Sequence, residues 1–181
     1  MQRAIELYNT PDGRVCVKPE NDAMFILDEN KSNIIQPMLG NIHNLYPDAF
    51  KKLSEIYSKS SRNKKYYEFR MVHRFCRCNF GSYDTLQKDI DANGGWHLEQ
   101  VNCPLRGECP DEGIICMPKL HTVLSDREFE VAKLLGYMSP EEISNELHLS
   151  IRTVYNHIQS IKFRLKLKTI AQIATWYKNK Q

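Results

Sequence analysis

Several features are missing from this 181-residue sequence, and each absence excludes a class of protein. No run of 18 or more apolar residues is present, which excludes a transmembrane helix. The first residues, MQRAIELYNTPDGRV, reach Asp12 and Gly13 before any apolar stretch long enough for a signal-peptide core. We therefore expect a cytoplasmic protein without a membrane partner. In that compartment disulfides are rare and grouped cysteines more often bind metal.

Enzyme motifs, internal repeats and low-complexity tracts are also lacking. His73, His97 and His121 stand alone in the sequence. The histidines, cysteines and acidic residues form no motif with the spacing that catalysis requires. We therefore expect that the protein is not an enzyme.

Acidic residues are unevenly distributed along the chain. None occurs from Ile151 to the C-terminus, where seven basic residues lie. A second basic stretch, residues 51–78, has nine basic and two acidic side chains, whereas residues 1–50 and 79–120 are net acidic. Clustered Lys and Arg displace counterions from phosphate backbones, so two basic blocks favour a nucleic-acid partner. The alternative is a pair of solvated helix faces.

The last sixty residues contain three helix starts in succession. Ser125 followed by Glu128, and Ser139 followed by Glu142, are capping-box patterns, and Ser150 is a third N-cap. The second helix is short and ends a few residues before Ser150, and two capped helices joined by so tight a turn make a helix-turn-helix. One side of the third helix is lined by Val154, Ile158, Ile161 and Leu165.

Residues from about 121 to 178 resemble the LuxR-type helix-turn-helix domain of bacterial transcription regulators. The resemblance covers about a third of the chain, and the spacing from Glu142 through Leu165 fits without a gap. It implies four helices, the third lying in the major groove and the fourth packing behind it or pairing two subunits. One departure is Arg164, which stands where lysine is common. The matching residues are Leu124, Arg127, Glu128, Glu130, Val131, Glu142, Ile143, Leu147, Ser150, Thr153, Val154, His157, Ile161 and Leu165.

The resemblance also implies roles for residues of the third helix, which starts near Ser150. Tyr155, Asn156 and Gln159 would face base edges, since Asn and Gln pair well with adenine and a tyrosine ring can meet a thymine methyl. The implied function is a sequence-specific DNA-binding regulator, with double-stranded DNA and a second copy of the chain as partners. Residues that would contact phosphates are Arg152, Thr153, Lys162 and Arg164.

The resemblance does not extend to the N-terminal part. We expect residues 1–118 to form an α+β domain with a cysteine-rich knuckle, and residues 119–181 to form the all-α, four-helix domain. RVCVKP, from Arg14, is typical of a strand after a Pro-Asp-Gly turn. Helical spacing predicts helices within residues 46–60 and 63–78. Neither the strand–helix alternation of a phosphorylated receiver nor the aromatic pocket signature of acyl-homoserine-lactone sensors is present.

Cysteines are the clearest functional signal in the N-terminal part. The stretch VNCPLRGECPDEGIIC holds three of the six cysteines and follows a C-x-C pair. Four soft ligands favour zinc or an iron–sulfur cluster. We expect the prolines after two of the cysteines to hold the chain extended away from the metal. The predicted zinc ligands are Cys78, Cys103, Cys109 and Cys116, with Cys76 as the substitute fourth ligand.

Other interpretations of the N-terminal part remain open. The cysteines would alternatively hold an iron–sulfur cluster, act as a thiol-based redox sensor, or stay reduced without metal. Cys16 is distant in sequence and is expected to be a buried small hydrophobe. The alternative function is a protein-interaction or redox/metal-sensing adaptor that contacts RNA polymerase through this domain. The basic stretch 51–78 would add phosphate contacts or bind a partner.

Overall fold

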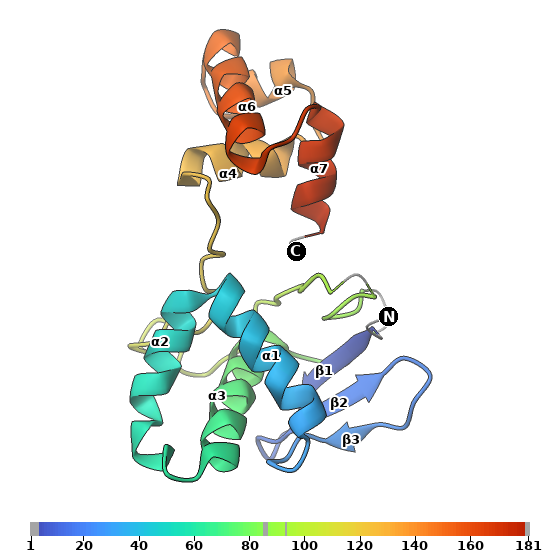
Figure 1. The fold of residues 1–181 in the computed structure, drawn as a ribbon, viewed down its shortest axis with the longest axis vertical. Helices are drawn as coiled ribbons and strands as arrows, with labels where there is room; N and C mark the ends of the chain where they lie inside the picture. The colour runs from blue at the N-terminus through green and yellow to red at the C-terminus, as the bar shows by residue number, and fades with distance from the viewer. Residues whose placement is uncertain (1–3, 85–86, 93, 180–181) are drawn as a thin grey trace. The chain divides into compact units, whose positions relative to one another are not determined.

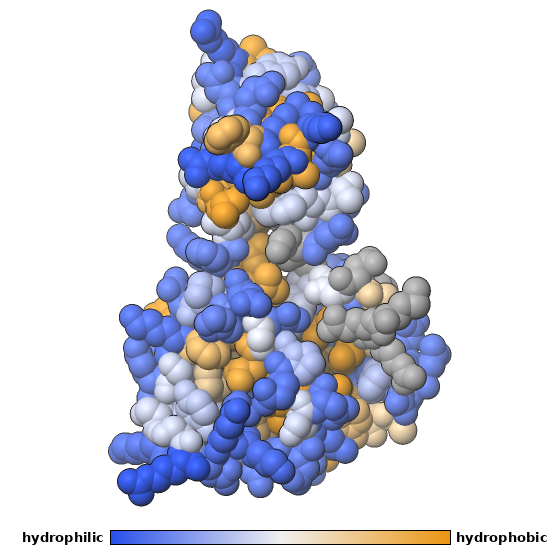
Figure 2. Space-filling view, viewed as in Figure 1, coloured by the Kyte–Doolittle hydropathy of each residue, from blue (hydrophilic) through white to orange (hydrophobic). Residues whose placement is uncertain are grey.

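The computed structural model describes residues 4–84, 87–92 and 94–179, which fold as two compact units (Figure 1). The first unit is Met1–His121 and the second is Thr122–Gln181. Within the described ranges, no helix has the length and apolarity needed to cross a bilayer. Figure 2 shows hydrophilic side chains over much of the visible surface of both units.

A small antiparallel sheet begins the N-terminal unit. Leu7 pairs with Val17 in neighbouring strands, and both side chains are fully buried on the face that packs against the helices. The turn between these strands is closed by Gly13, whose φ of +83° suits glycine. The predicted strand is confirmed, whereas its first partner strand was not foreseen. In spatial order the strands are β1 (Ile5–Asn9), β2 (Val15–Pro19) and β3 (Phe25–Ile26).

Helices α1, α2 and α3 pack on one another, and α3 also contacts β1 and β2. Asn63 caps α3 by accepting a hydrogen bond from the Tyr66 N–H. The two predicted helices are confirmed as α2 and α3, and the expected combination of sheet and helices is present. The helical elements are α1 (Ser32–Leu45), α2 (Pro47–Ile56), the short 3-10 helix η1 (Ser58–Ser60) and α3 (Lys64–Asn79).

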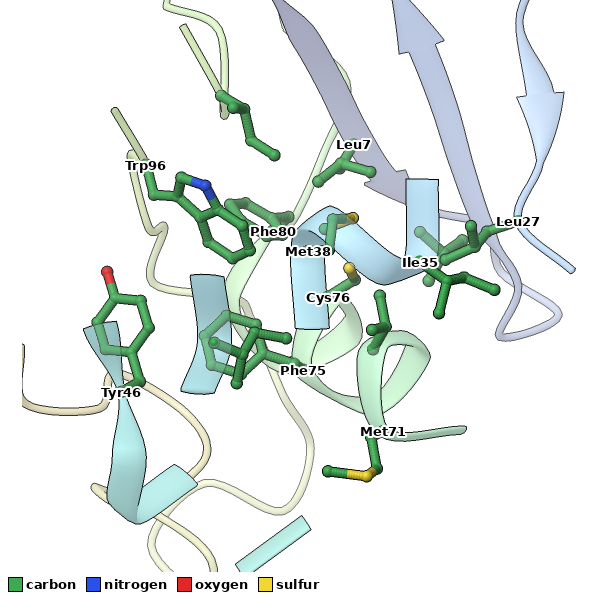
Figure 3. Close-up of a cluster of buried hydrophobic side chains, with 14 of the residues drawn as sticks. Leu7, Leu27, Ile35, Met38, Tyr46, Met71, Phe75, Cys76, Phe80 and Trp96 are labelled. Carbon is green, nitrogen blue, oxygen red and sulfur yellow. The ribbon is translucent and has the colours of Figure 1, made fainter. Parts of the chain in front are cut away.

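Aromatic rings form the centre of the N-terminal core (Figure 3). Trp96 lies 5.9 Å from Phe75, 5.9 Å from Phe80 and 6.4 Å from Tyr46, measured between ring centroids. Trp96 and the fully buried Ile115 come from the segment after α3, in which the described residues form isolated bridges and turns. This segment therefore folds by packing its side chains into a core built by the sheet and helices.

Four helices make up residues 122–179, the described part of the C-terminal unit, as the LuxR resemblance implied. Both predicted capping boxes are present, and a third, of Thr169 with Gln172, starts the last helix. Helix α4 packs against α6 and α7, and α5 packs against α6. Ring contacts of Phe129 with Trp176 and Tyr177 join the first helix to the last. The helices are α4 (Asp126–Leu134), α5 (Pro140–Glu146), α6 (Ile151–Leu165) and α7 (Ile170–Lys178).

Candidate nucleic-acid interface and cysteine pocket

Hydrogen bonds across the turn hold α5 and α6 in a fixed relation. The Leu149 N–H donates to the Ser144 carbonyl at 3.0 Å, and the Ser144 hydroxyl donates to the Leu149 carbonyl at 2.7 Å. Between them His148 takes a φ of +51°, the left-handed conformation that reverses the chain within so few residues. Arg127 of α4 donates to the Leu147 carbonyl at 2.8 Å. The helix-turn-helix is thus tied at the turn and to the helix before it.

Helix α6 has a buried face and an exposed face. Val154, Ile158 and Ile161 are buried in the domain core, one turn apart, as predicted. Tyr155, Asn156 and Gln159 lie on the opposite side, and Tyr155 is 43% exposed. The residues expected to face base edges are therefore brought together on the solvent side of one rigid helix.

Residues expected to contact phosphates have more varied surroundings. Arg152 is exposed in the first turn of α6, and Lys162 is half-buried near its end. Thr153 is half-buried, and its hydroxyl shares a 2.8 Å hydrogen bond with the hydroxyl of the N-cap Ser150. Thr153 thus helps to build the start of the helix, where backbone N–H groups and the helix dipole favour a phosphate.

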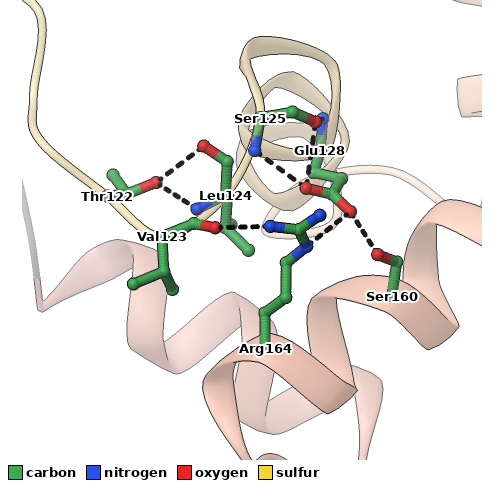
Figure 4. A network of polar contacts seen from close by, with 7 residues as sticks. All are labelled: Thr122, Val123, Leu124, Ser125, Glu128, Ser160 and Arg164. Atoms are coloured by element: carbon green, nitrogen blue, oxygen red, sulfur yellow. Dashed lines mark hydrogen bonds and ion pairs between the residues drawn. The ribbon is translucent and has the colours of Figure 1, made fainter.

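Arg164 is engaged within the domain (Figure 4). Its Nε lies 3.2 Å from Oε1 of the buried Glu128, and its Nη1 donates to the Val123 carbonyl at 3.1 Å. The Ser160 hydroxyl donates to the same carboxylate, and Ser125 donates to it through both its N–H and its hydroxyl. Burial raises the pKa of Glu128, but these hydrogen bonds and the Arg164 charge outweigh it and hold that pKa below its usual range. The structure thus gives Arg164 a partner inside the domain.

Four cysteines of the N-terminal unit share one pocket. Cys78, at the end of α3, lines a cavity of about 150 Å³ together with Cys103, Cys109 and Cys116. All four are half-buried free thiols. The structure thus brings together the four residues predicted as the main ligand set. The predicted substitute, Cys76, is fully buried in the core, where burial raises the pKa of its thiol strongly, and it does not line the pocket.

Two turns with the same backbone hydrogen bond contain Cys103 and Cys109. The Arg106 N–H donates to the Cys103 carbonyl at 3.1 Å, and the Glu112 N–H donates to the Cys109 carbonyl at 3.1 Å. Each cysteine is followed by proline at the second position of its turn, where the fixed φ of proline is favourable. The expectation that these prolines keep the chain extended is wrong, because they start turns. Cys-Pro-x-x is therefore a repeated structural unit of the pocket wall.

Buried polar groups fasten the cysteine segment to α3. The Asn79 side chain donates to the Ile115 carbonyl at 2.8 Å and accepts from the Met117 N–H at 2.8 Å, which holds the backbone on both sides of the fourth cysteine. Asp111, at the pocket wall, lies 3.6 Å from Arg74 and 3.7 Å from Lys52. The pocket is therefore a fixed part of the fold.

The four thiols share the pocket without forming a compact ligand cluster. Among the described residues, no group of three or more Cys, His, Asp or Glu side chains is arranged so as to hold a metal ion. Burial raises the pKa of Cys78, the nearby Arg74 charge lowers it, and the other three cysteines raise it further.

Sequence reasoning missed the contacts of several residues at both sites. Asn79 follows the C-x-C pair directly, but nothing local shows that it reaches Ile115, 36 residues away. Arg164 appeared to be one more basic residue of the recognition helix. Phe163 is 86% exposed on α6 and interrupts the polar residues of its exposed face. A large apolar residue among polar ones in this helix was the signal in the sequence that could have pointed to it.

A helix-turn-helix whose second helix buries an apolar stripe and exposes polar side chains is the arrangement found in many DNA-binding domains. Residues 122–177 match the family described as bacterial regulatory proteins, luxR family, and this match supports a DNA-binding transcription regulator. Regulators of this type are generally not enzymes. The comparison with curated proteins found no match to the chain. The comparison with solved structures found none either.

Proposed function

We propose that the protein is a sequence-specific transcription regulator that inserts α6 into the major groove of double-stranded DNA. The observation that supports this most directly is the exposed face of α6, which carries Tyr155, Asn156 and Gln159 opposite the buried stripe. The amides have the donor and acceptor pair that reads adenine, and the tyrosine ring offers an apolar surface to a thymine methyl.

Backbone contacts would set the register of the helix on DNA. Arg152 and the capped N-terminus of α6 stand where a phosphate is attracted by both charge and helix dipole. Lys162 adds charge near the other end of the helix. Arg164 acts indirectly in this proposal, because its pairing with Glu128 holds α6 against α4.

We further propose a homodimer on a two-fold DNA site. Helix-turn-helix dimers place their recognition helices about one helical turn of DNA apart, so the selected sequences should contain two inverted half-sites about 10 base pairs apart. The mass of the protein–DNA complex, measured by native mass spectrometry, should correspond to two chains per duplex. One chain per duplex with a single unrepeated site would contradict the dimer.

Selection of bound fragments from a random DNA pool tests the proposal. The unaltered protein should enrich one motif. Asn156→Ala and Gln159→Ala should each relax the preference at one position, at a cost of roughly 1–3 kcal/mol of binding free energy for a lost bidentate contact. Lys162→Ala is the control, and it should weaken binding to all sequences alike.

Two outcomes would overturn the assignment of α6. One is that the Asn156→Ala, Gln159→Ala double variant enriches the same motif with the same preference at every position. The other is that the unaltered protein enriches no motif. Circular dichroism should first show that the unaltered protein is helical and that the double variant has the same helix content.

A further inference from the structure

We propose that Cys78, Cys103, Cys109 and Cys116 hold an iron–sulfur cluster. The pocket that they line is the observation that carries this proposal. The inference goes beyond the proposed DNA binding and does not depend on it, because the pocket lies wholly within the N-terminal unit.

The size of the space between the cysteines favours a cluster over a single ion. Thiolates around one zinc ion lie about 2.3 Å from the metal, so their sulfurs nearly touch and enclose no cavity. Here the four cysteines, together with neighbouring side chains, line a cavity of about 150 Å³, and among the described residues no group of three or more Cys, His, Asp or Glu side chains is arranged to hold one ion. Cysteines around a cluster stand further apart, because iron and sulfide lie between them. Four cysteine ligands are the usual set for two-iron and four-iron clusters.

The charged side chains at the pocket leave a small positive excess. Arg74, Arg77 and Arg106 line the same cavity as the cysteines, and so do Asp111 and Glu112. Arg74 is paired with Asp111 at 3.6 Å and Arg106 with Glu112 at 3.3 Å, which leaves the charge of Arg77 in excess. The Nε of Arg74 is buried and has no hydrogen-bond partner among the residues that the structure describes. A buried donor without a partner is costly, and a cluster with its four thiolates, which carries net negative charge, would accept it or offset its charge.

Hydrogen bonds within the protein hold the wall of the pocket. The turns at Cys103 and Cys109 close with the same backbone hydrogen bond, and the Gly107 N–H donates to Glu112 Oε2 at 2.7 Å between them. Arg106 donates to the Val101 carbonyl at 2.7 Å, which closes the start of the segment. These contacts orient the ligands in the way that outer hydrogen bonds do at metal centres.

The decisive experiment uses the full chain, purified without oxygen and reconstituted with ferric iron, sulfide and a dithiol that reduces part of the iron. The expected result is a brown protein with about two or about four iron atoms per chain and an equal amount of acid-labile sulfide. Mössbauer spectroscopy of the iron-57 sample should show a cluster spectrum. This measurement on the unaltered protein does not depend on any variant folding.

Single substitutions then assign the ligands. Cys109→Ser and Cys103→Ser should each lower the bound iron several-fold. The matched control is Cys16→Ser, because Cys16 is also a free thiol but lies in β2 outside the pocket. It should keep the iron and sulfide content of the unaltered protein.

Three results would overturn the proposal. The first is a colourless protein with about one zinc per chain that excludes iron during reconstitution, as expected for the mononuclear site. The second is a folded protein that takes up neither metal. The third is iron and sulfide at equal levels in Cys109→Ser, Cys103→Ser and the unaltered chain. None of these bears on the DNA selection, so each proposal can fail alone.

Discussion

Each of the two units is stabilised by its own internal contacts, and the sequence separation of the bonded residues differs between the units. In the C-terminal unit the buried Glu128 is hydrogen-bonded to Ser125, three residues away, and repeated capping boxes define where helices begin. In the N-terminal unit the Leu7 N–H donates to Asp89 across 82 positions at 2.6 Å. Elements that are set by contacts a few residues apart can be predicted from the sequence. Elements that depend on pairs of residues far apart in the sequence cannot.

Truncation of a core side chain should give the largest difference between the unfolding free energies of the two units. Phe75→Ala removes a fully buried ring from the N-terminal core, and Ile158→Ala removes a buried side chain from the C-terminal core. We expect losses of about 3–5 and about 2–5 kcal/mol of unfolding free energy, each confined to its own unit. Urea unfolding followed by fluorescence separates them, because Trp96 lies in one core and Trp176 packs on the other.

The fluorescence of Trp176→Phe isolates the Trp96 signal, and the difference from the unaltered protein isolates Trp176. Lys59→Ala, on the exposed surface, is the control and should move neither transition by more than about 0.5 kcal/mol. A common shift of both signals in either core variant would show that the units unfold as one.

More of the C-terminal unit than of the N-terminal unit could be predicted from the sequence. Helices α4, α5 and α6 were predicted with their caps, because an N-cap and its partner lie three residues apart. The four cysteines could be grouped because their side-chain chemistry is distinctive. Strand β1 and Asn79 could not be placed, since β1 acquires its role only by pairing with β2 and with Ile90. The surroundings of Arg164 depend on tertiary packing, which a family pattern does not contain.

The pH dependence of stability should have opposite signs in the two units. Burial raises the pKa of Asp89 to about 8, the Leu7 N–H lowers it, and the charges of Glu6, Glu99 and Asp84 raise it further. The folded state therefore keeps this proton to a higher pH than the unfolded chain does. The N-terminal unit should lose stability as pH rises from about 4 to about 8, by up to about 1.4 kcal/mol per pH unit.

Glu128 acts in the other direction. The pKa of Glu128 in the folded state lies below the usual glutamate value. The ionised Glu128 therefore stabilises the C-terminal unit at pH values above the usual glutamate pKa, and this stabilisation is lost as pH falls through the folded-state pKa. Unfolding free energies of each unit from pH 3 to pH 8 check both signs. Asp89→Asn should flatten the N-terminal curve, and Glu128→Gln should flatten the acid limb of the C-terminal curve. A slope unchanged by its substitution would refute that assignment.

Surface charge should give the smallest effects on stability and the clearest contrast in DNA binding. Arg152→Ala on α6 and Arg62→Ala in the basic stretch 51–78 are a matched pair of exposed arginines. Both should change unfolding free energy by less than about 0.5 kcal/mol. Arg152→Ala should lower the slope of log affinity against log salt by about 0.9, whereas Arg62→Ala should leave it unchanged. Equal decreases in both variants would show that the N-terminal unit also contacts DNA.

Asn79 gives the cysteine pocket a thermodynamic connection to the rest of its unit. Cys78 directly precedes it, and Cys116 lies between the two residues whose backbone it binds. Any ligand that bridges these two thiols must therefore find the end of α3 folded and Ile115 seated in the core. By mass action such a ligand adds its binding free energy to the stability of the whole N-terminal unit, and withdrawing it would lower the melting temperature of that unit.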